Sequence, residues 1–200
     1  MYRGPGPRIF PIIVIILVIA LVVAALVSVG RMLFAGGDSS SGGGETTDAV
    51  VTALRDTSQD RSVRWTVRGP IVADENFRSY QITVGPNSRT YTVYAGYLEQ
   101  VLDTKTYSNN FAGYEQFVFA LDKAGVGVAR DAKNAEIRGV CATQGFAYVV
   151  ETLNDDKPDH MLWTTSCSGS KGTMVATVPQ VHALFVNQIP DFEPVFNRVY

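Results

Sequence analysis

An uncharged apolar run near the N-terminus, residues 9–29, constrains this chain more than any other feature. Its sequence is IFPIIVIILVIALVVAALVSV, in which Ser28 is the only polar side chain. A helix of this length spans roughly 30 Å, the thickness of the hydrocarbon core of a bilayer. Pro11 falls in the first turn, where a missing N–H group costs least. The run therefore predicts a transmembrane helix over residues 9–30.

The charges that flank this run predict its orientation. Arg3, Arg8 and the terminal amine precede it, whereas only Arg31 follows before the chain becomes acidic. Because positive charge is retained on the cytoplasmic side, we expect residues 1–8 to be a cytoplasmic tail. The rest of the chain is then held outside the cytoplasm, in a single-pass protein of the cell membrane.

A cleaved signal peptide is the alternative interpretation of the same run. Ala35 and Gly37 stand where the small residues of a cleavage site would be. The apolar run is longer than the core of a typical signal peptide, which favours an uncleaved anchor. Glycine and serine dominate the residues that follow, so we expect a flexible linker over residues 31–47.

The remaining segment, residues 48–200, has the length of one domain with its own core. The whole chain carries a formal charge of -2, with acidic and basic residues interspersed. Binding to phosphates needs a basic surface, so we expect no nucleic-acid partner.

Three segments at the start of this domain alternate between apolar and polar residues, as strands do. They cover residues 62–69, 77–84 and 89–95. A Gly-Pro-Asn-Ser cluster at 85–88 separates the last two and predicts a hairpin. We therefore expect a three-stranded meander. Its inward residues are Val63, Trp65, Val67, Tyr80, Ile82, Val84, Tyr91 and Val93.

Three segments have helical features. Residues 48–54 predict a short helix. In residues 110–125 apolar side chains recur on one helical face, with an asparagine cap before them and Gly125 after them. Thr177 begins a capping box with a proline in the first turn. The buried faces of the last two helices comprise Phe111, Tyr114, Phe117, Val118, Leu121, Val181, Leu184, Phe185 and Ile189.

A second hairpin stands between the last two helices, with alternating segments around a polar turn at 154–159. Its first strand contains Phe146, Tyr148 and Val150, and its second contains Met161, Trp163 and Thr165. Strands joined by short turns and followed by helices are typical of the α+β class. We expect an antiparallel sheet, a meander and then a hairpin, packed by about two helices.

Cys141 and Cys167 are the only cysteines in the sequence. An even number of cysteines in a domain outside the cytoplasm predicts a disulfide. The bond would enclose the second hairpin. Two cysteines alone lack the further ligands that zinc needs, and His160 and His182 stand at no recognised spacing from them.

For the other candidate residues, an ordinary loop or turn explains the sequence better than a catalytic or metal-binding role. Ser168 and Lys171 match the spacing of serine-lysine hydrolases, but glycines around them predict a loop. Asp155, Asp156 and Asp159 are more typical of a solvated turn than of a calcium site. We expect no catalytic residues, no metal and no cofactor. The domain is therefore expected not to be an enzyme, and a small hydrolase is the least favoured reading.

Tyrosines offer a different route to function. Tyr94 and Tyr97 fall off the buried face of their strand, where tyrosine side chains suit binding of a protein or a glycan. The competing interpretation is that these rings cover the edge of the core. The sequence thus favours a tethered binding or envelope-structural domain.

Three stretches carry a resemblance to a known group of proteins. They read TVRGPIVADENFRSYQITVGPNSRTYTVYAGY, YEQFVFALDKAG and CATQGFAYVVETLNDDKPDHMLWTTSC. Together they resemble a family of uncharacterised, single-pass membrane-anchored extracytoplasmic proteins of ultrasmall, host-dependent bacteria. The resemblance implies a bacterial cell membrane and no particular activity.

A fainter similarity concerns the fold alone. A helix that ends at LDKAG, a cysteine, a hairpin and a second cysteine are arranged as in subtilisin-inhibitor-like domains. The chain departs from those domains because it lacks their first disulfide, and residues 140–143 make a poor reactive loop. The similarity implies a protease-inhibitor-like or other ligand-capturing domain as the alternative function.

Overall fold

The computed structural model describes residues 42–97, 100–131, 136–141 and 144–196. The predicted tail (1–8), the predicted transmembrane helix (9–30) and the linker as far as residue 41 lie outside the described residues. Within those ranges no helix is both long and apolar enough to cross a membrane. Gly42–Tyr200 forms one compact unit.

The described residues form an α+β domain, which confirms the predicted class. Its helices are α2 (Gly42–Arg55), α3 (Phe111–Lys123) and α4 (Val178–Val186), with a short 3-10 helix η1 at Asp74–Asn76. Its strands are β1 (Arg61–Arg68), β2 (Arg78–Val84), β3 (Ser88–Ala95), β4 (Gln100–Ser108), β5 (Ala147–Asn154) and β6 (Lys157–Thr165).

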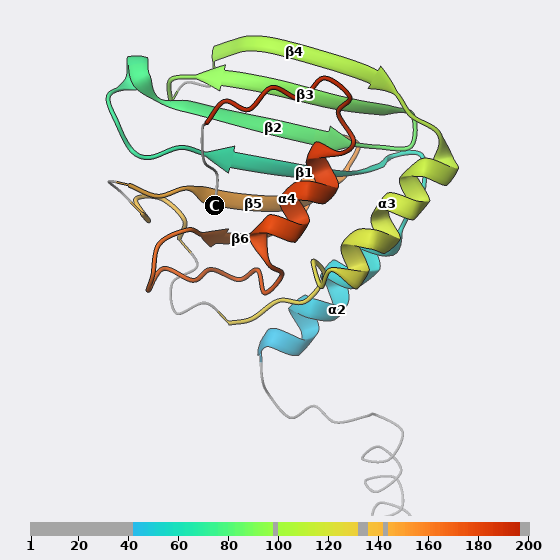
Figure 1. The fold of residues 1–200 in the computed structure, drawn as a ribbon. Helices are drawn as coiled ribbons and strands as arrows, with labels where there is room; N and C mark the ends of the chain where they lie inside the picture. Colours follow the sequence, from blue (N-terminus) through green and yellow to red (C-terminus); the bar gives the residue numbers. More distant parts are fainter. Residues whose placement is uncertain (1–41, 98–99, 132–135, 142–143, 197–200) are drawn as a thin grey trace, which may run out of the picture. The chain divides into compact units, whose positions relative to one another are not determined.

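The strands form one sheet in the order β4-β3-β2-β1-β5-β6, with every neighbouring pair antiparallel (Figure 1). The predicted meander and the predicted hairpin are therefore parts of a single sheet. They join where β1 pairs with β5, which places Trp65 opposite Val150. Strand β1 thus has strands on both sides and lies at the centre of the fold.

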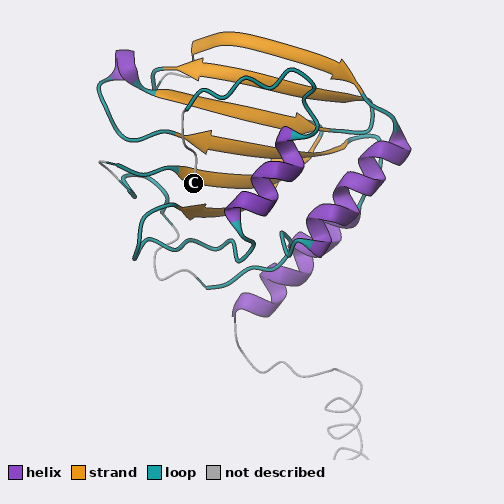
Figure 2. Ribbon diagram, viewed as in Figure 1, coloured by secondary structure: helices purple, strands orange, loops and turns teal. Residues whose placement is uncertain are grey.

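The helices cover one face of this sheet, and the core lies between the two layers (Figure 2). Trp65 stacks on Tyr148 from β5 and on Phe185 from α4, with ring centroids 5.7 and 5.8 Å away. Most of the predicted core residues are buried, but Val93 and Leu184 are half-buried at the edge of the core and Phe111 is exposed. We call the face turned away from the helices the open face.

The helix predictions are right in place and wrong in some details. Asn110 caps α3 by accepting a hydrogen bond from the backbone of Gly113, as predicted. Phe111 is 47% exposed, because it stands at the first residue of the helix before the buried face begins. The Thr177 hydroxyl is directed to the Gln180 side chain at 3.4 Å, so the predicted capping box does not form.

Two element boundaries also differ from the sequence predictions. Helix α2 begins at Gly42, inside the segment predicted as linker, although the sequence indicated a helix only from residue 48. The turn between β5 and β6 is the pair Asp155 and Asp156, both with positive φ, so the strands extend further than expected. Strand β4 was not predicted at all.

Candidate functional site

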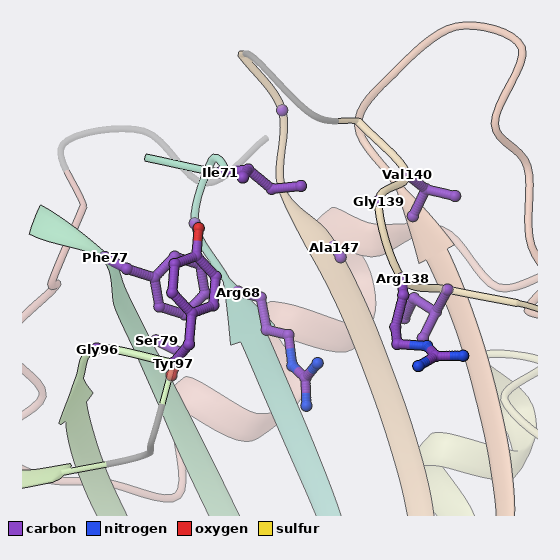
Figure 3. A pocket seen from close by; sticks show the side chains of 13 residues that line it. Arg68, Ile71, Phe77, Ser79, Gly96, Tyr97, Arg138, Gly139, Val140 and Ala147 are labelled. Atoms are coloured by element: carbon purple, nitrogen blue, oxygen red, sulfur yellow. The ribbon is translucent and has the colours of Figure 1, made fainter. Parts of the chain in front are cut away.

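A cavity of about 260 Å³ opens at one end of the sheet, where β1, β2 and β5 meet two loops (Figure 3). Its floor is a row of three residues on adjacent strands: Ser79, Arg68 and Ala147. The register of the sheet places them opposite one another, so their side chains share one face. We call this space the end cavity.

One wall of the end cavity is aromatic and is firmly held. Tyr97 stacks on Phe77, with ring centroids 4.1 Å apart. The Asp74 carboxylate accepts a hydrogen bond from the Tyr97 backbone at 2.7 Å. The Tyr97 hydroxyl donates to the Val72 carbonyl at 2.9 Å and accepts from its N–H at 3.1 Å. The ring is fixed at both ends, yet the residue stays 47% exposed.

Residues 136–141 form the opposite wall, to which they contribute Ile137, Arg138, Gly139 and Val140. The Val140 N–H donates to the Ile137 carbonyl, which closes a turn. Beyond the turn, Cys141 and Cys167 lie at disulfide distance, as predicted, with Cα atoms 5.7 Å apart. The bond ties this wall to the end of β6.

Gly145 allows the disulfide to lie close to the sheet. A Cβ atom at this position would overlap the sulfur atoms of Cys141 and Cys167. The residue also lines the end cavity, so the disulfide and the cavity are separated by one glycine. The covalent bond predicted for stability therefore also positions the cavity wall.

The charged side chains in the described lining of the end cavity are Arg68 and Arg138. The Arg68 guanidinium lies between the two walls (Figure 3). Arg138 pairs with Glu136 at 2.6 Å, and this arginine holds the pKa of the Glu136 carboxyl well below its usual range. The other side chains that line the cavity in the described part of the chain are apolar or aromatic, apart from Ser79.

A second cavity of about 300 Å³ continues across the open face of the sheet. Arg68 and Ile137 line both cavities, so the two spaces adjoin. Polar pairs fix the floor of the second cavity: Arg64 to Glu151 at 2.7 Å, and the Tyr94 hydroxyl to the Gln81 carbonyl at 2.9 Å. We call the two cavities together the open-face groove.

The groove brings together the tyrosines that the sequence singled out. Tyr97 lies in the end cavity and Tyr94 in the second cavity. Tyr94 is half-buried on the open face, opposite to the buried Tyr91 of the same strand. Sequence reasoning missed the wall formed by Ile137 and Val140, because nothing local indicates that this loop returns to the sheet.

The remaining candidate residues lie away from the groove. His182 contacts the Tyr80 hydroxyl at 2.9 Å on the helix-covered face, and burial lowers its pKa. Ser168 and Lys171 lie in a loop after β6, as predicted, and neither they nor His160 line the groove.

The acidic turn offers no metal site in the described part of the chain. Asp159 pairs with Arg61 and accepts a hydrogen bond from Thr152. Despite partial burial, these two partners lower its pKa. The described residues contain no group of three His, Cys, Asp or Glu side chains placed to hold a metal ion.

The groove combines three kinds of surface chemistry. The end cavity offers a fixed aromatic ring, branched apolar side chains and a guanidinium group. Such a mixture is typical of recognition sites, in which apolar walls supply contact area and a few polar groups fix orientation. Comparisons with models of known families and with curated proteins find no match for this chain.

Proposed function

We propose that residues 48–200 are a non-catalytic binding domain, tethered outside the cytoplasm by a helix over residues 9–30. Its ligand occupies the open-face groove. The observation that carries the proposal is Tyr97, an exposed ring held by a stacking partner and by hydrogen bonds at both ends. A ring that is already fixed loses little conformational entropy when a ligand covers it.

The chemistry of the end cavity favours a peptide segment with an apolar side chain and a carboxylate. Ile71, Ile137 and Val140 provide an apolar lining, and the Arg68 guanidinium can donate two parallel hydrogen bonds to a carboxylate. A sugar would need partners for its hydroxyl groups. Among the described residues, the lining of this cavity contains no Asp, Glu, Asn or Gln side chain, so a glycan would leave polar groups unpaired there.

The location of the domain is part of the same proposal. The apolar run and the charges around it support a single-pass anchor in a cell membrane. The disulfide supports an oxidising compartment. A bacterial origin, drawn from the family resemblance, belongs to the proposal on the same terms.

Binding can be tested on a ¹⁵N-labelled domain that begins at Gly42. The probes are an acidic tetrapeptide with a C-terminal phenylalanine and an oligomer of N-acetylglucosamine. We expect the peptide to shift the amide resonances of Arg68, Gly96 and Gly139, which line the end cavity. Tyr97→Ala should weaken peptide binding by roughly tenfold or more, since exposed aromatic anchors dominate such contacts.

Phe111→Ala is the matched control, because Phe111 is also 47% exposed but lies on α3 and lines neither cavity. It should leave binding unchanged. Equal affinity of the two variants, or a response to the sugar alone, would contradict the proposal. Stoichiometric inhibition of a serine protease by the domain would favour the inhibitor alternative instead.

A further inference from the structure

The two edges of the sheet are treated differently by the rest of the described chain. Strand β6 is covered: the Trp163 carbonyl accepts a hydrogen bond from Met174, and its N–H donates to the Thr173 hydroxyl. Strand β4, at the other edge, has only β3 as a sheet neighbour among the described residues (Figure 1). An open edge is a ready template for another strand.

Hydrogen bonding at the end of the ladder shows which groups of β4 face outward. The Asn109 N–H donates to the Asn87 carbonyl, so this pair bonds across the ladder. Bonded and non-bonded pairs alternate in antiparallel sheets. Asp103, Lys105 and Tyr107 therefore turn their backbone groups toward β3. The residues that turn theirs outward are Thr104, Thr106 and Ser108.

The usual deterrent to edge pairing is a lysine that projects from the strand. On β4 the Lys105 ammonium is drawn back over the helix-covered face. It lies 3.2 Å from the Asp191 carbonyl and 3.7 Å from the Glu193 carboxylate. Residues 103–108 also pair regularly with β3, because the irregularity of the ladder lies before them. In this segment the Ser108 carbonyl accepts a hydrogen bond from the Arg89 guanidinium at 2.8 Å. The described part of the chain places no strand beside the outward backbone groups of Thr104 and Thr106.

We propose that β4 pairs with the β4 of a second copy of this chain, antiparallel and about a two-fold axis at Thr106. Thr106 then lies opposite its own equivalent, Thr104 opposite Ser108, and Lys105 opposite Tyr107. On the open face the opposed side chains all carry hydroxyl groups. On the helix-covered face Lys105 stands opposite Tyr107, so no two like charges are opposed. All three outward-facing residues are paired.

Other registers are less favourable for the same strand. An axis at Lys105 would place two ammonium groups opposite each other. An axis at Thr104 would bring Leu102 into the ladder, where the pairing with β3 is irregular. The chain as a whole carries a formal charge of -2, so net repulsion between copies is small. The proposal is independent of the groove.

Amide hydrogen exchange measured at several concentrations tests the pairing in the domain that begins at Gly42, whose core is formed within that unit. We expect the Thr104, Thr106 and Ser108 amides to become protected as concentration rises. The Lys105 and Tyr107 amides should be protected at every concentration. Exchange of the outward amides that does not depend on concentration would overturn the proposal.

Sedimentation of two variants provides a second measurement. Thr106→Pro removes an outward N–H, and proline is tolerated on edge strands with that group facing solvent. Because both copies lose a donor, we expect association to weaken by roughly tenfold or more. Thr106→Val keeps the N–H and should still associate. Association that survives the proline would contradict the model of pairing.

The register has its own test. With the axis at Thr106, a Thr106→Cys variant should crosslink to its equivalent under mild oxidation, since opposed Cα atoms lie about 5.5 Å apart. Thr104→Cys should not crosslink, because it faces Ser108 of the other copy. A crosslink at position 104 without one at 106 would overturn the proposed register.

Discussion

Phe119 and Leu121 stand two residues apart on α3 in opposite environments. Leu121 is fully buried, whereas Phe119 is 46% exposed. We expect Leu121→Ala to lower the free energy of unfolding by about 2–5 kcal/mol, because the surrounding core cannot collapse into the space. Phe119→Ala, on the same helix, should cost under about 0.5 kcal/mol. Urea denaturation checks both, and equal losses would show that α3 is not packed as described.

His182 links stability to pH. Burial lowers the pKa of this side chain below its ordinary value of 6.5. The unfolded chain therefore binds the proton more readily, so stability should fall as pH drops below about 6.5 and level off below the folded pKa. Thermal unfolding of His182→Gln should lack this part of the decline between about pH 7 and 5. An unchanged pH profile would contradict the assignment to His182.

For individual side chains, the sequence predicted burial well where apolar and polar residues alternate regularly. Val63, Trp65 and Val67 are all buried as expected. Phe111 was misplaced because helical periodicity does not say where the packed part of a helix begins. For the groove, Tyr97 could be singled out from its strand, but its fixation by Phe77 and Asp74 depends on contacts 20 and more residues away.

Elements with both faces exposed are the ones that sequence reasoning misses. Strand β4 reads QVLDTKTYS, and none of its residues is buried. An edge strand of this kind needs no apolar alternation, so the pattern that reveals β1 and β2 is absent. The sequence also could not predict that the meander and the hairpin form one sheet. Their junction is the pairing of β1 with β5, and this pairing joins segments that are far apart in the chain.

Gly172 allows a loop to lie along β6. A Cβ atom there would overlap the carbonyl and the indole ring of the buried Trp163. We expect Gly172→Ala to destabilise the domain by about 1–3 kcal/mol, as overpacking does. Gly85→Ala, where the nearest atom would be 3.4 Å away, is the control and should be much milder. Calorimetry of the two variants measures both losses of stability. Equal losses would show that the loop at Gly172 is not packed tightly against β6.

The disulfide joins residues 26 positions apart. In the loop-entropy account, replacing both Cys141 and Cys167 by serine should cost roughly 3–4 kcal/mol of stability. The variant should also bind the peptide probe less well than the native domain, because the bond anchors one wall of the end cavity. Native binding with lowered stability would show that the wall holds its place without the bond.

For the molecule as a whole, the first prediction to check is the orientation of the chain in the membrane. Arg3 and Arg8 predict that the N-terminus lies in the cytoplasm. Protease added to intact spheroplasts should therefore remove the domain and leave a small protected fragment, while a cytoplasmic marker protein survives. Complete protection of the domain would reverse the predicted orientation.

The central place of β1 has a consequence for the order of synthesis. One edge of this strand pairs with β2, which follows it closely, but the other waits for β5, beginning at Ala147. Until the ribosome has made β5, a nascent chain displays an apolar strand with a bare edge in the middle of its future sheet. Completion of the fold is thus a late event, and fragments that stop before Ala147 should aggregate rather than fold.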